Sequence, residues 1–480
     1  MTRQGRRRRG LLKRKFKETE EQMKEINYIR DLHLRKNLKD VVEIQSCLPP
    51  EILVKIFGYC ATNEGNLSLF KLANVSSGWE KLIKSKCLWK CVDLVEGVEN
   101  LTIEKWKSMR KTFVPLLRES KKVRLNTSII TTRWDNFFFN FPSVTEISFV
   151  GTRNLRPEVL LDIIHSKIKI ESLNFDGVFL SFIPSKIIRK MATTILPSLK
   201  KLVLSNNSLY ITAIEVLFKV VGQSCEQLEV LELENCLPPN RIAVPELDYS
   251  SIRRNCRSLR VLNFSFTFID PQIPKTVYPQ NDTLDLRELH MGSTIRSYRR
   301  FGDNFLLDFV GNCKNLETIN ANYLPNCNSL HFLQKIKAKR MKNLYICNIF
   351  NGKYDIQAIT SQATIVFGRW QSTLLTLDLS RNIMIDSLWL TIFESFCKDS
   401  PLETLYLNCS NITTRPFITA IKQFTNLSYL DTSYCTNIIE RSLRQKFYKE
   451  DCKKLKVNYF WFDNPLYNIQ RNSEYFIDII

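Results

Sequence analysis

One apolar phrase recurs along most of this chain, and it restricts the possible fold more than any other feature of the sequence. Its two clearest copies read Leu199-x-x-Leu202-x-Leu204-x-x-Asn207-x-Leu209 and Leu374-x-x-Leu377-x-Leu379-x-x-Asn382. Further copies begin at Val144, Ile170, Leu228, Leu259, Leu286, Leu316, Met341, Leu402, Leu427 and, in degenerate form, Leu455. Successive copies are about 28 residues apart on average, which leaves room for a strand, a turn and a full helix in each unit. Because one such unit cannot bury its apolar face alone, the pattern predicts an α/β stack with parallel strands inside and helices outside.

Cysteine accompanies this phrase at two kinds of position. Some copies are preceded by Cys-x-x, at Cys225, Cys256, Cys313 and Cys452, and others carry a cysteine in the turn after the strand, at Cys236, Cys409 and Cys435. We expect these thiols to be small core residues rather than redox centres. The chain resembles the cysteine-containing subclass of leucine-rich-repeat proteins, and this resemblance implies a horseshoe whose strands line the concave side.

The repeat region is expected to span residues 95–455, with about 12 repeats of which the first are irregular. Residues 270–282 contain three prolines, which predicts an extended loop where a helix would otherwise stand. The aromatic residues within 456–480 are expected to cap the open end of the stack. The three phenylalanines at 137–139 are expected to be core residues, although they could also form a binding patch.

The residues between the leucines are expected to face the concave solvent, because strand side chains alternate between two faces. The position between the second and third leucines forms a column that comprises Val203, Glu232, Asn263, His290, Asn320, Tyr345, Asp378, Tyr406 and Asp431. Together with the flanking columns, this face carries five acids and one lysine. A nucleic-acid-binding groove is expected to carry Lys and Arg instead.

The column from Glu232 to Asp431 is therefore our candidate target-binding face. We expect a polar or basic protein segment to lie along it, with Tyr345, Tyr406 and Tyr429 as aromatic anchors. A contact site on a loop or on the C-terminal cap remains an open alternative.

The first 17 residues carry nine basic side chains and no acid, out of a formal net charge of +21 for the whole chain. This run predicts a disordered, solvated tail, a nuclear-localisation-like signal or non-specific attraction to nucleic acid. The residues of the candidate signal are Arg6, Arg7, Arg8, Arg9, Lys13, Arg14 and Lys15. In residues 18–46 acids come first and bases later, an order that favours a linker helix.

Residues 47–94 have a different pattern, with three short amphipathic segments in about 45 residues. The first opens with Pro49 and Pro50, which are well tolerated at a helix start. Its apolar positions, and those of the two segments that follow, are Leu48, Ile52, Leu53, Ile56, Phe57, Leu69, Leu72, Val75, Trp79, Leu82, Ile83, Leu88 and Trp89. A unit this small hides only part of its apolar surface, so we expect it to need a partner.

This pattern resembles an F-box, although Tyr59-Cys60 stands where that family usually has a leucine. The resemblance implies that one set of residues docks on, or shapes the surface for, a Skp-type adaptor: Leu48, Pro49, Ile52, Ile56, Phe57, Val75 and Trp79. The adaptor in turn would hold a cullin and a RING subunit. Alternatively, the prolines and Trp79 only stabilise the first repeat and have no role in adaptor binding.

Several classes of protein are disfavoured by the sequence. It contains no C-x-x-C pair, no H-E-x-x-H and no glycine-rich phosphate loop, and it lacks an apolar run long enough to span a membrane. We therefore expect a non-catalytic protein without a metal or organic cofactor, located in the nucleus, the cytoplasm or both. The expected function is substrate recognition within an SCF-type ubiquitin ligase, leading to degradation of the target. The alternative is a nuclear scaffold that associates with nucleic acid through its basic tail; an enzyme with an unrecognised site is the least expected case.

Overall fold

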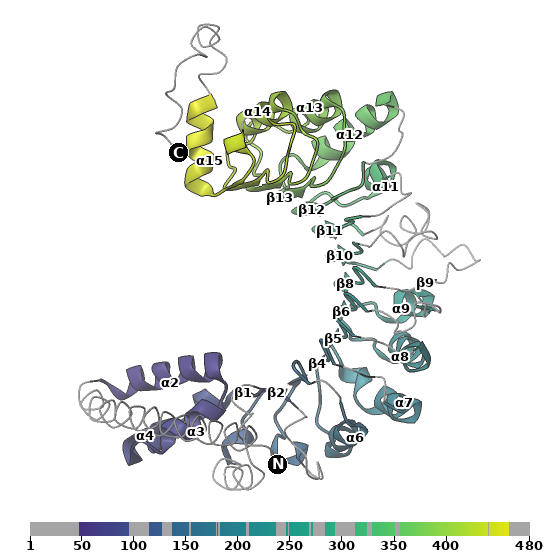
Figure 1. The fold of residues 1–480 in the computed structure, drawn as a ribbon. Coiled ribbons are helices and arrows are strands. Elements are labelled where there is room, and N and C mark those ends of the chain that lie inside the picture. Colours follow the sequence, from purple (N-terminus) through teal and green to yellow (C-terminus); the bar gives the residue numbers. More distant parts are fainter. Residues whose placement is uncertain are drawn as a thin grey trace, which may run out of the picture. The chain divides into compact units, whose positions relative to one another are not determined.

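The computed structural model of the chain describes residues 48–95, 115–126, 137–152, 155–178, 180, 183–207, 211–236, 246–247, 249–267, 270–271, 284–292, 313–323, 329–350, 356–439 and 441–459. These residues belong to two compact units, Met1–Arg124 and Leu125–Ile480 (Figure 1). The basic tail, the candidate localisation signal and the linker helix predicted for 18–46 lie outside the described residues.

In the first unit, the described residues begin with three helices, as the sequence predicts. They are α2 (Pro50–Glu64), α3 (Leu67–Ala73) and α4 (Ser77–Ile83), followed by the 3₁₀ turn η1 (Lys86–Trp89). Pro50 occupies the first helical turn of α2, where no backbone donor is needed, and Gly65 ends that helix with a positive φ of 76°. The side chain of Ser76 caps α4 by accepting a hydrogen bond from the Trp79 backbone N–H. Strands β1 (Cys91–Leu94) and β2 (Lys122–Leu125) follow and pair with each other.

The second unit consists of repeated strands and helices. Its parallel strands are β3 (Glu146–Ser148), β4 (Ser172–Asn174), β5 (Lys201–Val203), β6 (Val230–Glu232), β8 (Val261–Asn263), β10 (Glu288–His290), β11 (Thr318–Asn320), β12 (Asn343–Tyr345), β13 (Thr376–Asp378), β14 (Thr404–Tyr406) and β15 (Tyr429–Asp431). Each pairs with its neighbour in this order, and each starts two residues after the first position of a predicted copy of the phrase. The period read from the sequence therefore located these strands correctly.

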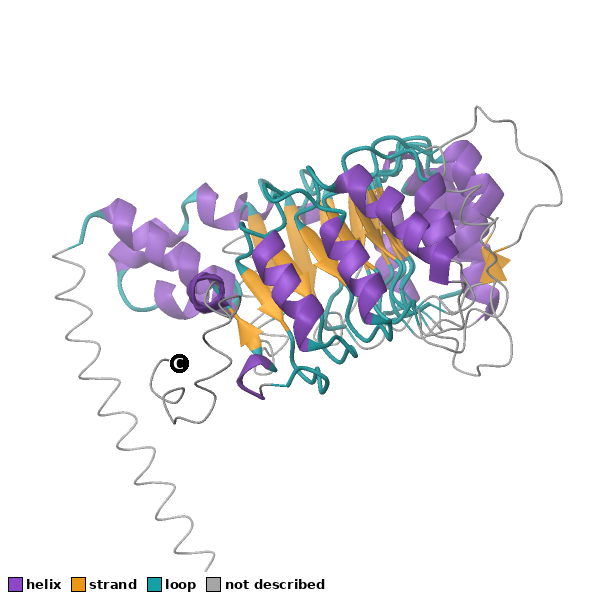
Figure 2. Ribbon diagram, turned by 90° about the horizontal axis from the view of Figure 1, so that it is seen from above, coloured by secondary structure: helices purple, strands orange, loops and turns teal. Residues whose placement is uncertain are grey.

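Helices cover one face of this sheet. They are α6 (Pro157–Ser166), α7 (Ser185–Thr194), α8 (Ile211–Ser224), α9 (Tyr249–Asn255), α11 (Ser329–Lys335), α12 (Ile356–Trp370), α13 (Asp386–Glu394) and α14 (Thr414–Gln423). The 3₁₀ turn η3 (Phe138–Asn140) precedes α6, η4 (Leu196–Ser198) follows α7, and η5 (Arg441–Leu443) follows α14 and β15. Within this unit the helices form the outer side and the strands line the concave inner side, as expected (Figures 1 and 2).

The central residue of each strand points into the core between sheet and helices. These residues are Ile147, Leu173, Leu202, Leu231, Leu262, Leu289, Ile319, Leu344, Leu377, Leu405 and Leu430, and each is at most 1% exposed. Burial of one such side chain contributes about 1.5–3 kcal/mol. The residues on either side of the core position are mostly half-buried and lie on the concave face.

A residue in the left-handed backbone conformation follows most strands, and its backbone N–H can donate a hydrogen bond to the next repeat. The non-glycine members of this set within the repeats are Asn206, Asn235, Phe266, Tyr323, Asn348, Arg381, Cys409 and Tyr434, all with φ between 54° and 62°. In one example the Asn206 backbone N–H donates to the Glu234 carbonyl oxygen at 2.8 Å. Asparagine adopts this conformation readily, whereas Phe266, Tyr323 and Arg381 are held in it by the same contact to the next repeat.

At several of these turns the position after this residue carries a side-chain donor, which explains why either Asn or Cys can stand there in the phrase. Asn207 Nδ2 donates to the Phe175 carbonyl oxygen at 2.8 Å, and Cys236 Sγ makes the equivalent contact to Leu204 at 3.0 Å. Asn382 does the same for Ile346 at 3.0 Å, and its Oδ1 also accepts two backbone N–H groups. Any small side chain that can donate therefore satisfies a buried carbonyl of the preceding repeat.

The structure corrects the expectation of a final repeat at Leu455. Cys452 and Leu455 lie in a helix, α15 (Lys449–Tyr459), and the sheet ends with β16 (Lys446–Phe447), which runs antiparallel to β15. The Cys-x-x-Leu spacing fits the start of a repeat, but it equally places the two residues on one face of a helix. Both residues are buried. Within the described residues the stack is thus closed by β16 and α15, and residues 460–480 of the predicted cap lie outside that description.

Two further expectations need correction at single residues. Phe137 and Phe138 are buried, as expected, but Phe139 is 52% exposed. Cys409 is exposed rather than buried because it occupies the left-handed position of its turn, one residue before the buried donor position. Of the proline-rich segment 270–282, only Asp270–Pro271 is described, as strand β9, which pairs in parallel with β7 (Glu246–Leu247).

Candidate functional site

Helix α2 has an exposed apolar stripe beside a buried one. Leu53, Phe57 and Ala61 face the core of the first unit and are at most 8% exposed. On the neighbouring stripe, Ile52 is 39% exposed and Ile56 is 43% exposed. Tyr59 extends this second stripe and is 73% exposed, at the i, i+4 and i+7 spacing of one helical face. We call Ile52, Ile56 and Tyr59 the α2 stripe.

Aromatic packing holds α2 in place. The Phe57 and Trp79 rings meet edge to face, with centroids 5.0 Å apart, and Trp79 is 7% exposed. Both residues were predicted either to dock on an adaptor or to shape the surface of this chain that meets the adaptor. Their burial is consistent with the second role. Of the other residues in that prediction, Leu48 and Val75 are half-buried, whereas Pro49 is exposed at the N-terminus of α2.

The helices of the first unit are joined to its strands by buried polar contacts. Asn66, only 1% exposed, donates to the Leu88 carbonyl oxygen at 3.2 Å and accepts from the Asp93 backbone N–H at 2.7 Å. The Trp89 indole N–H donates to the Ile83 carbonyl oxygen at 2.7 Å. Because these contacts join α3, α4 and β1, and the Phe57–Trp79 packing joins α2 to α4, the α2 stripe is presented on a rigid support.

The concave face of the second unit brings the predicted target-binding residues into one row. Backbone pairing aligns Glu232 with Asn263, then His290, Asn320, Tyr345, Asp378, Tyr406 and Asp431. The register inferred from the repeat phrase is therefore confirmed residue by residue. Binding of a target to this row stays a prediction.

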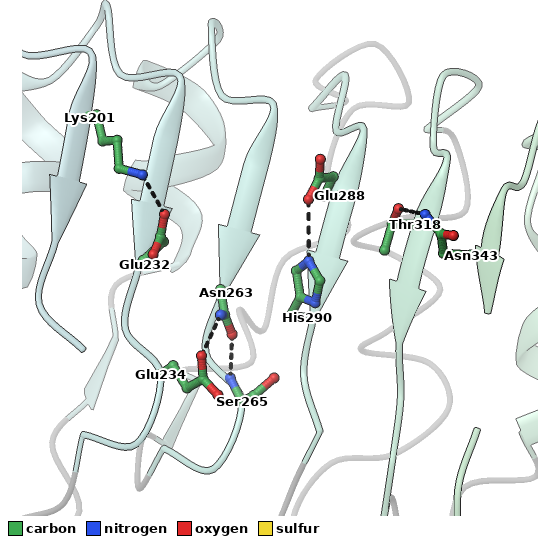
Figure 3. A network of polar contacts seen from close by, with 9 residues as sticks. All are labelled: Lys201, Glu232, Glu234, Asn263, Ser265, Glu288, His290, Thr318 and Asn343. Atoms are coloured by element: carbon green, nitrogen blue, oxygen red, sulfur yellow. Dashed lines mark hydrogen bonds and ion pairs between the residues drawn. The ribbon is translucent and has the colours of Figure 1, made fainter. Parts of the chain in front are cut away.

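The first half of this row is a network of internal polar contacts (Figure 3). Lys201 Nζ lies 2.8 Å from Glu232 Oε1, and Asn263 Nδ2 donates to Glu234 Oε2 at 3.1 Å. Further along, His290 Nε2 and Glu288 Oε2 lie 3.4 Å apart, and Asn343 Nδ2 donates to Thr318 Oγ1 at 3.0 Å. The carboxylates in this half already have partners within the chain.

The second half of the row alternates tyrosine and aspartate over β12 to β15. Tyr345, Asp378, Tyr406 and Asp431 are in register on four adjacent strands. The Tyr406 ring centroid lies 5.3 Å from that of Tyr429, which belongs to the neighbouring row. We call Tyr345, Asp378, Tyr406, Asp431 and Tyr429 the tyrosine–aspartate cluster.

Burial and the two carboxylates perturb this cluster electrostatically. Burial raises the pKa of Asp378, hydrogen bonds from Ser380 and Asn322 lower it, and the nearby Asp431 charge raises it further. Burial also raises the pKa of Tyr406, and the negative charges of Asp378 and Asp431 act in the same direction. The cluster thus combines aromatic rings with negative charge.

The buried cysteines are unsuited to nucleophilic or redox chemistry. Burial raises the pKa of Cys236 and of Cys256 to about 12 and that of Cys313 to about 11, so each remains a thiol at neutral pH. Within the described part of the chain, no three His, Cys, Asp or Glu side chains come together in a way that could hold a metal ion. A search of the same residues finds no helix with the length and apolar character needed to cross a bilayer.

Comparison with known families identifies the first unit. Residues 45–95 match the family model described as F-box-like. The chain carries an F-box-like domain at these residues. The match covers the three helices α2 to α4, the η1 turn and β1, so the α2 stripe belongs to the F-box-like domain.

Beyond the F-box-like domain, the comparisons are less specific. No curated protein matches the sequence closely enough to count as a relative. Among solved structures, the crystal structure of the leucine-rich repeat domain of APL1B is similar, with 18% sequence identity over 70% of this chain and 88% of that chain and a TM-score of 0.31. The leucine-rich-repeat fold of the second unit follows from its own strand order, register and buried leucines.

Sequence reasoning missed two exposed tyrosines. Tyr59 was noted only as a departure from the usual F-box pattern, yet it completes the α2 stripe of the F-box-like domain. Tyr448 follows β16, and its ring centroid lies 5.6 Å from that of Tyr429, at the edge of the tyrosine–aspartate cluster. The helical spacing from Ile52 and Ile56 could have indicated Tyr59, whereas nothing in the repeat phrase indicated Tyr448, because the antiparallel turn of β16 breaks the period.

Proposed function

We propose that this protein is the substrate-recognition subunit of an SCF-type ubiquitin ligase. One observation carries the proposal: a helix of an F-box-like domain exposes Ile52, Ile56 and Tyr59 on one side, while its other apolar side is fully used in the core. An exposed apolar stripe on a rigid helix is suited to burial against a partner. F-box domains generally bind Skp-type adaptors, and the proposed partner of the stripe is therefore such an adaptor, with a cullin and a RING subunit beyond it.

In this role the protein performs no bond chemistry. The F-box-like domain binds the adaptor, and the leucine-rich-repeat unit binds the target through its concave face. Holding both in one assembly raises the effective concentration of target lysines at the ubiquitin-loaded conjugating enzyme, which itself supplies the thioester. Ubiquitination then leads to proteasomal degradation of the target.

Co-purification with the adaptor and the cullin tests this function. We expect Ile56→Asp to abolish recovery of both, since it places a charge in the centre of the α2 stripe. Ile439→Asp is the matched control, because Ile439 is also an exposed isoleucine, at 73%, but lies in the second unit. Phe57→Asp is unsuitable, because Phe57 is 1% exposed and its replacement would disrupt the fold.

Unchanged recovery of adaptor and cullin with folded Ile56→Asp would contradict adaptor binding through the α2 stripe. Absence of both from the unmutated chain would favour the alternative of a scaffold without a ligase role. Location is a separate proposal: the nucleus, the cytoplasm or both, with residues 6–15 as the nuclear signal. Imaging a variant that lacks residues 1–17 tests it, and full nuclear retention of that variant would exclude the signal.

A further inference from the structure

The carboxylates of the tyrosine–aspartate cluster differ from the glutamates of the concave face in the groups that they contact. Glu232 forms an ion pair with Lys201, and Glu288 lies 3.4 Å from His290. Asp378 and Asp431 instead accept hydrogen bonds from backbone N–H groups, those of Ser380 and Ser433, at 2.9 and 3.0 Å. Among the described residues, neither aspartate has a basic nitrogen within the 4.0 Å of an ion pair.

The basic residues nearest in the fold do not supply the missing charge. Lys446 stands opposite Asp431 in the antiparallel pair of β15 and β16, but it is exposed and forms no ion pair with it. The Arg381 guanidinium is placed over the Tyr323 ring, 5.9 Å from its centroid. Asp378 is half-buried and Asp431 is buried, so both carboxyl groups lie in a partly desolvated setting that a bound cation would stabilise.

The rings beside these carboxylates specify the kind of cation. Strands lie about 4.8 Å apart, so Asp378 is flanked on both sides by a tyrosine of the same row, Tyr345 and Tyr406. A guanidinium can stack on an aromatic face and pair with a carboxylate at the same time, which an ammonium does less well. Phosphate groups would be repelled by the two aspartates, which excludes a nucleic acid as the occupant.

We propose that the tyrosine–aspartate cluster binds an extended, arginine-containing segment of the target protein. This inference rests on the proposed function, in which the concave face holds the target. Asp378 and Asp431 pair with two arginines of the segment, and the rings of Tyr345, Tyr406 and Tyr429 pack against their guanidinium planes.

The strand spacing also sets the distance between the two arginines. Asp378 and Asp431 are two strands apart, or about 9.6 Å. In an extended polyproline-type segment, three residues advance the chain by about 9.3 Å. The segment therefore carries two arginines three positions apart, running across the strands rather than along them.

Peptide binding to the 480-residue chain tests this inference. The probe is the fluorescein-labelled peptide Gly-Ser-Gly-Arg-Gly-Ser-Arg-Gly-Ser-Gly, measured by fluorescence anisotropy at about 0.15 M salt. A second peptide replaces both arginines with glutamine, and we expect it to bind at least about tenfold more weakly. Equal binding of the two peptides would overturn the inference.

Variants of the chain locate the binding. Asp378→Asn combined with Asp431→Asn removes both charges but keeps the acceptors for Ser380 and Ser433, so we expect an intact fold and about tenfold weaker binding of the arginine peptide. Asp176→Asn combined with Glu234→Gln removes the same charge outside the cluster and should change affinity by less than about twofold. Equal effects of the two double variants would mean that only net charge matters and would refute a specific site.

Two variants of Tyr406 test whether the aromatic ring itself contributes to binding. Tyr406→Phe keeps the ring and should preserve affinity, whereas Tyr406→Leu should lower it by about three- to fivefold. Equal affinity of these two variants would contradict the role of the ring.

Two further outcomes separate this inference from its alternatives and from the proposed function. Binding of the arginine peptide only after removal of residues 1–17 would make the chain's own basic tail the occupant and would overturn the proposal of a target segment. Adaptor binding is measured on the same samples. Loss of the adaptor with retained peptide binding refutes the ligase role alone, and retained adaptor without peptide binding refutes this inference alone.

Discussion

Truncation of Ile56 to alanine separates the role of α2 in binding from its role in folding. Full burial of an isoleucine side chain is worth about 1.5–3 kcal/mol. Since 43% of Ile56 is exposed, a partner that covers it completely gains about two fifths of that range, or about 0.6–1.3 kcal/mol. Ile56→Ala should therefore raise the Kd for a Skp-type adaptor by about three- to ninefold. The free energy of unfolding should fall by no more than about 0.9–1.7 kcal/mol, because only the remaining part of the side chain is covered within the fold.

The neighbouring residue provides the contrast. Phe57 is 1% exposed and packs on Trp79, so Phe57→Ala should lower the free energy of unfolding of the F-box-like domain by about 3–5 kcal/mol. Calorimetric titration with the adaptor and urea unfolding followed by circular dichroism measure the two effects separately. Ile439→Ala is the binding control, since this 73% exposed residue lies outside the domain. An unchanged adaptor Kd for Ile56→Ala, with normal unfolding, would show that the α2 stripe is not the docking surface.

Three other predictions concern folding and thiol reactivity. Asn382→Leu should lower the free energy of unfolding by about 2–4 kcal/mol in urea titrations, because it leaves the Ile346 carbonyl and two backbone N–H groups buried without partners; a loss below about 1 kcal/mol would contradict this role. Ser76→Ala removes the cap of α4 and should cost about 1 kcal/mol, with Ser76→Asp as the variant expected to restore it. Because burial raises the pKa of Cys236 to about 12, this thiol should resist iodoacetamide at pH 8 in the native protein and should react only as the pH approaches that value or as the chain unfolds. The exposed Cys409 should be labelled at once. Mass spectrometry of native and urea-treated samples measures the labelling of each cysteine.

The strand positions could be predicted because the repeat phrase reports a local requirement. Each strand needs a buried residue at its centre, such as Leu377, and several turns need a side-chain donor, such as Asn382, so periodic spacing alone locates both. The same phrase failed at Leu455, where a Cys-x-x-Leu spacing also fits one face of a helix. Local spacing cannot decide between these two cases, because the presence or absence of a neighbouring strand to pair with decides it.

The sequence by itself determined the kinds of element, their order and which residues share the concave row, since those follow from apolar periodicity and from the alternation of strand side chains. Only the tertiary structure decided that Phe57 serves the core while Ile56 remains at the surface, because two adjacent apolar residues of a helix differ only in what packs against them. The same holds for the left-handed turns at Phe266 and Tyr323, whose conformation depends on a backbone hydrogen bond that each donates to a carbonyl oxygen of the next repeat. It holds equally for Asp378, which has no basic partner among the residues that the structure describes, because only the fold decides which side chains come near it.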